Sequence, residues 1–386
     1  MALASDVLSA IDRARAQDLL ERLIRIPTPS GKEQPAAETL ESYLREAGFA
    51  DVRRDPNGNV LVTVKGSRPG SRRAFFTHTD TTGVGDMKDP YEPRVLPGEA
   101  FGKQGPVIRG LGAAAPKSAV AAMVEGLSAL IRSKHEIAGT IYLAIVTKDL
   151  FADHAGPKEI LASFPFEADW MVAGEPSGNK LVLGARGIGH YRVTFTGKAT
   201  HNGRPKDGVN PLFALADLLG ELERLQLPTH PSLGPATISP FEVGSNALPP
   251  LTPTRAHAVI DRRMLPGERA DAVQEGIVAM AQGIAARRPG MGAEVERVRA
   301  MHPFDTPADS PLVKALRETV KKRTGSDLET TYIAFSSNAG YAIAERGWRG
   351  VGLGPGYITD LGANEHVEVA QLERATRIFA ALMAED

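Results

Sequence analysis

A histidine and an aspartate two residues apart, His78 and Asp80, form the first pattern in the sequence whose types and spacing could do chemistry. They follow the apolar run at residues 74–77, which predicts a buried strand. An aspartate placed this way can accept a hydrogen bond from one imidazole nitrogen, which leaves the other oriented for a metal ion or for proton transfer. A histidine beside an aspartate is also a common structural or surface pair, so both interpretations are kept.

Further motifs follow this pair along the chain, each weak alone but specific as an ordered set. They are Asp89-Pro90-Tyr91, Ile108–Gly112 with Lys117 after it, Gly174-Glu175-Pro176-Ser177, Gly184–Gly187, Gly197–His201, Gly208-Val209-Asn210, Asn246, Arg263, Leu265–Glu268, Gly354-Pro355-Gly356 and Asn364-Glu365. In order and spacing the series resembles the M20 family of metallopeptidases and amidohydrolases, the family of acetylornithine deacetylase and succinyl-diaminopimelate desuccinylase. The resemblance runs from the first predicted helix to the last.

The elements that must position these residues are predicted from hydrophobic periodicity. Strands expected at residues 60–64, 74–77, 141–146 and 170–173 alternate with helices expected at 36–47 and 119–131, which predicts an α/β fold with a mainly parallel sheet covered by helices on both faces. Residues 187–298 change to a strand-helix-strand-strand-helix order and predict a smaller inserted α+β domain between residues 1–186 and 299–386. The resemblance implies a ferredoxin-like lid that forms a homodimer.

The resemblance also implies a metal centre, because M20 enzymes hold two zinc ions bridged by an aspartate and a water, with a glutamate as general base. The first histidine ligand matches His78, its orienting aspartate matches Asp80, and a carboxylate ligand matches Glu175. The bridging aspartate falls on Ala115 and the last histidine ligand falls on Leu361. The implied second metal site would need these two positions and Phe151, and all three are apolar.

The paired glutamates of the family, the general base and a ligand, fall on Leu150 and Phe151 when Asp149 is matched to the aspartate before them. A shifted alignment with a three-residue insertion would use Asp153 and His154 instead. We expect no intact dinuclear zinc centre, and at most one weakly held divalent metal at His78 and Glu175, because two protein ligands are fewer than zinc sites usually have.

Candidates for substrate contacts are also implied by the resemblance. His201 matches the histidine that lines the partner subunit's active site and steadies the oxyanion. Asn246 and Arg263 match residues that contact the substrate or its carboxylate, and the loop at Gly356 would supply backbone donors. Lys117 is a possible electrostatic stabiliser. Structural hydrogen bonding is the alternative for Asn246 and Arg263, and a solvated lysine is the alternative for Lys117.

Composition narrows the classes of protein. The 386 residues carry a formal net charge of −1, 42% are hydrophobic and 24% are charged, which is typical of a globular protein and argues against nucleic-acid binding through bulk charge. The chain has no cysteine, so thiolate metal sites and cysteine nucleophiles are excluded. No signal peptide or long apolar run is recognised, which predicts a cytoplasmic protein without a membrane partner.

Three functions stay open at this point. The first is an M20-fold hydrolase of an amide C–N bond in a small carboxylated substrate, such as an acyl-amino acid or a dipeptide, working without an intact dinuclear metal site. Retention of His78, Asp80 and Glu175 favours it. The second is a non-catalytic small-ligand-binding or partner module, which the missing general base favours. The third is another metal-free acid/base or acyl-transfer reaction using His78 and Asp80, because fold alone does not select chemistry.

Overall fold

The computed structural model describes residues 7–150 and 153–384 and divides into two compact units. The larger unit comprises Met1–Gly184, Thr306–Thr331 and Tyr341–Asp386, and the smaller comprises Ala185–Asp305 and Tyr332–Gly340. The chain therefore leaves the larger unit and returns to it twice. The domain limits expected from the sequence, 187–298 for the insertion, are narrower and stay a prediction.

The helices of the larger unit are amphipathic or, for the central one, apolar nearly all round. They are α2 (Arg13–Ile24), α3 (Gln34–Glu46), η1 (Gly98–Phe101), α4 (Lys117–Arg132), α5 (Ala155–Ser163), α8 (Pro311–Thr324), α9 (Asn338–Arg346), η3 (Ile358–Asp360) and α10 (Val369–Met383). Asp12 begins α2 by accepting from the backbone N–H groups of Ala14 and Arg15. Ser310 begins α8 in the same way with Val313, as side-chain oxygens do at helix N-termini.

The strands of the larger unit form a large sheet and a small one. They are β1 (Val52–Arg54), β2 (Val60–Lys65), β3 (Arg68–His78), β4 (Arg94–Leu96), β5 (Val107–Arg109), β6 (Ala138–Val146), β7 (Trp170–Gly174), β8 (Leu181–Ala185), β16 (Thr330–Ile333), β17 (Arg349–Leu353) and β18 (His366–Glu368). The large sheet includes the order β1-β2-β6-β3-β7-β17-β8, and β16 also pairs with β8. Its centre, β6-β3-β7-β17, is parallel, and its flanks are antiparallel.

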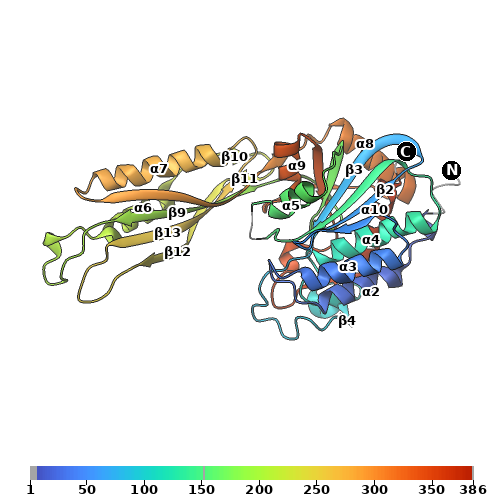
Figure 1. Ribbon diagram of the computed structural model, residues 1–386, viewed down its shortest axis with the longest axis horizontal. Helices are drawn as coiled ribbons and strands as arrows, with labels where there is room; N and C mark the ends of the chain where they lie inside the picture. Colours follow the sequence, from blue (N-terminus) through green and yellow to red (C-terminus); the bar gives the residue numbers. More distant parts are fainter. Residues whose placement is uncertain (1–6, 151–152, 385–386) are drawn as a thin grey trace. The chain divides into compact units, whose positions relative to one another are not determined.

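Alternation along β3 shows how the sheet is covered. Phe75 packs edge-to-face with Trp170 and with Phe379 of α10, whereas the next residue, Phe76, lies beside Phe166 and Trp348. Successive side chains on a strand point to opposite faces, so apolar material covers both. Figure 1 shows α4 on one side of these strands and α5 and α9 on the other. The predicted mainly parallel sheet with helices on both faces is confirmed.

The smaller unit is a four-stranded antiparallel sheet with two helices. Its elements are β9 (Gly187–Thr196), η2 (Pro205–Asp207), α6 (Pro211–Arg224), β10 (Thr229–His230), β11 (Gly234–Pro235), β12 (Thr237–Ser245), β13 (Arg255–Met264), α7 (Ala270–Ala286), β14 (Gly292–Met301) and β15 (Phe304–Asp305). The order β12-β13-β9-β14 and the chain order β9-α6-β12-β13-α7-β14 make it ferredoxin-like. Residues of α6, α7, β9 and β13 share one apolar core, so both helices cover the same face.

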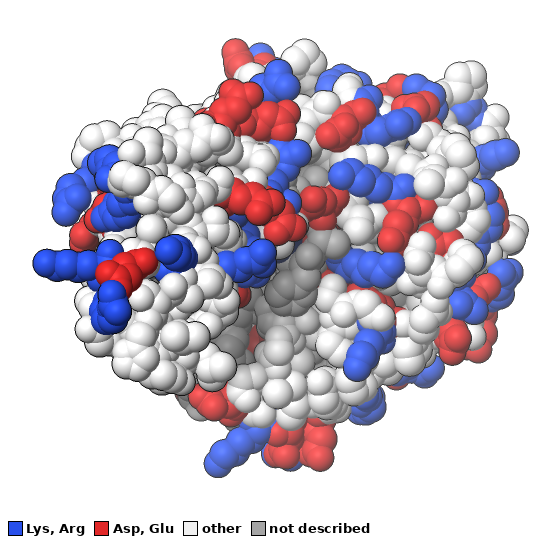
Figure 2. Space-filling model, turned by 60° about the vertical axis from the view of Figure 1, so that its left-hand side comes forward, with Lys and Arg blue, Asp and Glu red and all other residues white. Residues whose placement is uncertain are grey.

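The surface carries charges of both signs. In the view of Figure 2, Lys and Arg side chains are interspersed with Asp and Glu side chains and form no field of one sign. Among the helices of the described residues, none is long and apolar enough to cross a membrane.

Candidate functional site

The carboxyl ends of the parallel strands bring the candidate residues of the larger unit to one edge of the sheet. His78 ends β3 and is paired in register with Val146, the last residue of β6. Asp149 follows β6, and Glu175 follows β7 directly. Loops at the carboxyl ends of parallel strands are where open α/β sheets place their sites.

The His78 ring lies between two carboxylates. Its Nδ1 is 2.8 Å from Asp80 Oδ1, as the sequence predicted, and its Nε2 is 3.7 Å from Asp149 Oδ2. Asp80 is fully buried, whereas the side chains of His78 and Asp149 are 13% and 14% exposed. The Nδ1 side of the ring therefore faces a fully buried carboxylate, and the Nε2 side faces a partly exposed one.

The charges around His78 favour its protonated form. Burial alone would lower the pKa of His78, but Asp149, Asp80 and Glu175 together raise it to about 9. Burial alone would likewise raise the pKa of Asp80, but bonds to His78, to the Leu150 backbone and to Ser30 hold it below its usual range. At neutral pH the structure thus favours an imidazolium beside ionised Asp80.

Glu175 is held by its own backbone and by glycines of the neighbouring strand. Its N–H donates to Leu353 O at 3.1 Å. A Cβ at Gly352 would lie 2.9 Å from Glu175 Cγ, and one at Gly354 would lie 2.5 Å from Glu175 O. The glycines around the end of β17 therefore leave the room that the Glu175 side chain and backbone occupy.

The segment before α4 surrounds a buried carboxylate. Glu365 is 1% exposed and accepts from Ala114 N at 3.0 Å and from Ala115 N at 3.3 Å. Burial raises the pKa of Glu365 to about 7 although these N–H groups and Lys117 lower it. Lys117 is itself fully buried, and its Nζ donates to Ile26 O at 2.9 Å. Burial lowers the pKa of Lys117 to about 7.

Two of the predicted substrate contacts are therefore engaged inside the protein. The Lys117 side chain has no exposed surface. A role as a substrate contact stays a prediction, and the burial of the side chain argues against it. The N–H of Gly356 donates to Gln371 Oε1 at 2.7 Å. Its φ of +75° and a distance of 2.4 Å from a built Cβ to Ala114 O explain why glycine stands there.

Ala115, Leu361, Leu150 and Phe151 are the positions that match the lost family residues. Ala115 and Leu361 are partly exposed, and neither side chain offers a donor atom. The backbone N–H of Leu150 donates to Asp80 Oδ2, and Phe151 lies outside the described residues. Of the shifted alternative, Asp153 is exposed and His154 is buried against the Tyr341 ring. In the part of the chain that is described, no three His, Asp or Glu side chains converge as a metal site would require.

The smaller unit carries the other candidates. His201 is exposed, and its Nδ1 accepts from Gly203 N at 3.0 Å. Asn246 Oδ1 accepts from the backbone of Thr254 and Arg255, and its Nδ2 donates to Thr254 Oγ1. These bonds fit the structural alternative for Asn246.

Arg263 makes a bidentate ion pair with Asp261, with N–O distances of 2.7 and 3.0 Å. A substrate carboxylate would have to exchange with Asp261 to bind this guanidinium.

Sequence reasoning missed the place of Asp149 beside His78 and the place of Glu365 beneath the segment before α4. Asp149 entered the sequence argument only as an alignment marker, although a carboxylate three residues after a buried strand was a usable signal. Glu365 entered the sequence argument only through the Asn364-Glu365 motif, and its contacts with residues 112–115, about 250 positions away along the chain, have no local signal.

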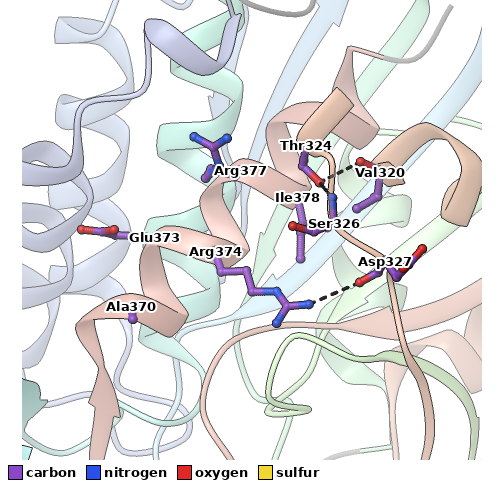
Figure 3. A pocket seen from close by; sticks show the side chains of 9 residues that line it. All are labelled: Val320, Thr324, Ser326, Asp327, Ala370, Glu373, Arg374, Arg377 and Ile378. Carbon is purple, nitrogen blue, oxygen red and sulfur yellow. Dashed lines mark hydrogen bonds between the residues drawn. The ribbon is translucent and has the colours of Figure 1, made fainter. Parts of the chain in front are cut away.

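A separate hollow of about 150 Å³ lies between α8 and α10 (Figure 3). Arg374 points toward Asp327 there and donates to its backbone oxygen. None of the candidate residues lines this hollow, so it does not extend the site around His78.

Comparison with known proteins connects this geometry to a family. The chain is 27% identical to a succinyl-diaminopimelate desuccinylase of Thioalkalivibrio sulfidiphilus, with 95% of this chain and 96% of that protein covered. It resembles in fold a tripeptidase of Staphylococcus aureus (TM-score 0.78, 19% identity, 97% and 100% covered). Human carnosine dipeptidase 1 gives a TM-score of 0.73 at 16% identity, with 99% of each chain covered. Residues 74–385 match the Peptidase family M20/M25/M40, so the chain belongs to this family of hydrolases.

Proposed function

We propose that this protein hydrolyses an amide C–N bond of a small carboxylated substrate, of the acyl-amino-acid or dipeptide class, without an intact dinuclear metal centre. The observation that carries the proposal is the His78 ring held between Asp80 and Asp149 at the carboxyl edge of the sheet. The substrate class follows the names of the relatives, a desuccinylase, a tripeptidase and a dipeptidase.

The donor set does not fit two zinc ions. Ala115 and Leu361 contribute no ligand atom, and Leu150 stands where the family resemblance implies a general base. The remaining pair, His78 and Glu175, is two ligands short of an ordinary four-ligand site. The Nε2 atom of His78, which would face a metal, instead faces Asp149 Oδ2. At most one weakly held zinc is proposed, at His78 and Glu175.

Proton transfer can be assigned to the residues present. Amide hydrolysis needs an acceptor for a proton of the attacking water and a donor for the leaving amine. Because its pKa is about 9, His78 is protonated at neutral pH and is suited to donate from Nε2 to the amine nitrogen. Asp80 holds the ring through Nδ1. Glu175, whose charge acts on His78, is the proposed acceptor of the water proton.

The experiment is a parallel screen of turnover and binding. Purified protein is incubated with N-acyl amino acids, including N-succinyl compounds, and with dipeptides, and release of the free amine is measured. Binding is followed by calorimetry on the same compounds. The proposal expects amine release from at least one class. Tight binding without any release across the panel would favour the non-catalytic binding module instead.

A homodimer through the smaller unit is part of the proposal, and a cytoplasmic location stays a prediction. Within the described residues β12 pairs with β13 alone, and it exposes Phe241 (59%) and Val243 (58%). Next to it lies a groove whose apolar lining includes Leu219 and Ile238. Unpaired edges with apolar side chains favour pairing with another strand.

In sedimentation velocity, Phe241→Lys is expected to yield monomer. Val298→Lys, on the opposite edge strand, is expected to leave the dimer intact. A wild-type monomer would refute the dimer.

A further inference from the structure

The turn after β6 has an unusual set of acceptors. Four consecutive backbone N–H groups, those of residues 147–150, each donate to a side chain from elsewhere in the chain. Thr147 N donates to Asn59 Oδ1 at 2.9 Å and Lys148 N to Glu33 Oε1 at 2.8 Å. Asp149 N and Leu150 N donate to the two oxygens of Asp80 at 3.1 and 2.9 Å. We call Asn59, Glu33 and Asp80 the turn clamp.

The turn clamp is built from buried groups. Asn59 and Asp80 are fully buried and Glu33 is 2% exposed. Glu33 precedes α3 but makes no capping bond to that helix, so its carboxylate serves the turn instead. Hydrogen bonds to ionised carboxylates are stronger than neutral ones and fix geometry well.

The backbone of the turn needs such support. Lys148 has a φ of +55°, in the left-handed region that residues other than glycine adopt at a cost of order 1–3 kcal/mol. A conformation of this kind persists where the surroundings over-determine it. Since the N–H of Lys148 itself donates to Glu33, the strained residue is held directly by the turn clamp.

The turn clamp also determines the geometry around His78. Asp80 Oδ1 is bonded both to His78 Nδ1 and to Asp149 N, so one carboxylate fixes the ring and the turn together. Glu33 fixes the residue before Asp149 from the other side. The Asp149 carboxylate is thereby placed 3.7 Å from His78 Nε2, on the exposed side of the ring.

We propose that Asp149 belongs to the functional centre as the carboxylate that orients the Nε2 side of His78, and that Glu33 is the positioning residue that holds Asp149 there. The assignment deepens the proposed hydrolase function and rests on it for its catalytic consequence. It adds two residues that lie far from His78 in sequence to the residues on which turnover depends.

The test uses the full-length protein labelled with ¹⁵N-histidine, with the His78 ring signals assigned by their loss in His78→Gln. At one fixed pH, Asp149→Asn and Glu33→Ala are each expected to move the His78 Nε2 resonance. Glu33→Gln should restore it, because the amide oxygen can still accept from Lys148 N. Glu38→Ala, at an exposed position in the helix that Glu33 precedes, is the matched control and should leave the signals in place.

Kinetics complete the test on any substrate that the wild type turns over. Glu33→Ala is expected to lower kcat on the order of a hundred-fold with little change in KM, as a misplacement of about 1 Å can do, and Glu33→Gln should recover most of it. Unchanged His78 resonances in both Glu33→Ala and Asp149→Asn would overturn the assignment. Asp149→Asn, at a partly exposed side chain, keeps the test decisive if Glu33→Ala fails to fold. Absence of wild-type turnover would refute the hydrolase, while the resonances would still decide the placement.

Discussion

Replacing His78 by alanine is expected to lower kcat/KM by about a hundred- to ten-thousand-fold, the usual range for losing a general acid or base. The ring is the group whose Nε2 faces the exposed side of the centre, and Asp80 fixes its other nitrogen at 2.8 Å. Asp80→Asn should give a loss of similar size, because the same carboxylate also accepts from the backbone of Asp149 and Leu150. Amine release is the measurement, and Asp86→Asn, at an exposed carboxylate, is the control.

The pH dependence of turnover distinguishes a proton-donating role of His78 from a purely structural one. Because the pKa of His78 is raised to about 9, its proton-donating form is present below that value and is lost as pH rises through it. Turnover is therefore expected to fall above about pH 9. In Asp149→Asn the fall should move to lower pH, since the largest raising influence on the ring is gone. If His78→Ala and Glu175→Ala both left turnover unchanged, the proposed centre would be wrong.

Replacing Glu365 by alanine is expected to lower the free energy of unfolding by about 2 to 6 kcal/mol, because two backbone donors would lose their buried acceptor. The backbone N–H groups of Ala114 and Ala115 would lose their acceptor, and an unpaired buried donor costs about 1–3 kcal/mol. Lys117 would lose its neighbouring carboxylate. Glu365→Gln keeps an acceptor oxygen and should lose less.

Urea unfolding measures this, with Glu318→Ala on the exposed face of α8 as the control. The pKa of Glu365 is raised from 4.5 to about 7, so the folded state holds a proton that the unfolded state has released. The stability from this group is fully present below pH 4.5 and is lost as pH rises through about 7. Glu365→Gln should flatten that part of the stability profile. A loss below about 1 kcal/mol in Glu365→Ala would show that the carboxylate does not anchor the segment before α4.

Much of the fold follows from periodicity, and the exceptions have physical reasons. The buried core of β3 was predicted, but the strand begins earlier, at Arg68. Pro69, Gly70 and the polar side chains after them show no hydrophobic strand pattern. Its early part pairs with β6 through backbone bonds that side-chain patterns do not report. The two helices of the smaller unit follow the predicted strand-helix-strand-strand-helix order, because each has a continuous apolar stripe.

The site was predictable where its parts are adjacent in sequence. The contact of His78 with Asp80 needs only a spacing of two at a strand end. The burial of Lys117 was not predictable, because a lysine at the start of a helix is usually solvated. This one is fully buried and donates to the backbone of Ile26, which is 91 residues away. The role of Glu33 depends on a turn 115 residues away. Contacts of this kind require the tertiary fold.

Turnover by chelator-treated protein, with residual metal measured on the same sample, tests the central claim most directly. The residues around His78 predict that amine release continues at its original rate with less than one divalent metal bound per chain, because Ala115 and Leu361 supply no ligands. Loss of turnover on chelation, with recovery as two zinc ions per chain are taken up, would contradict the account.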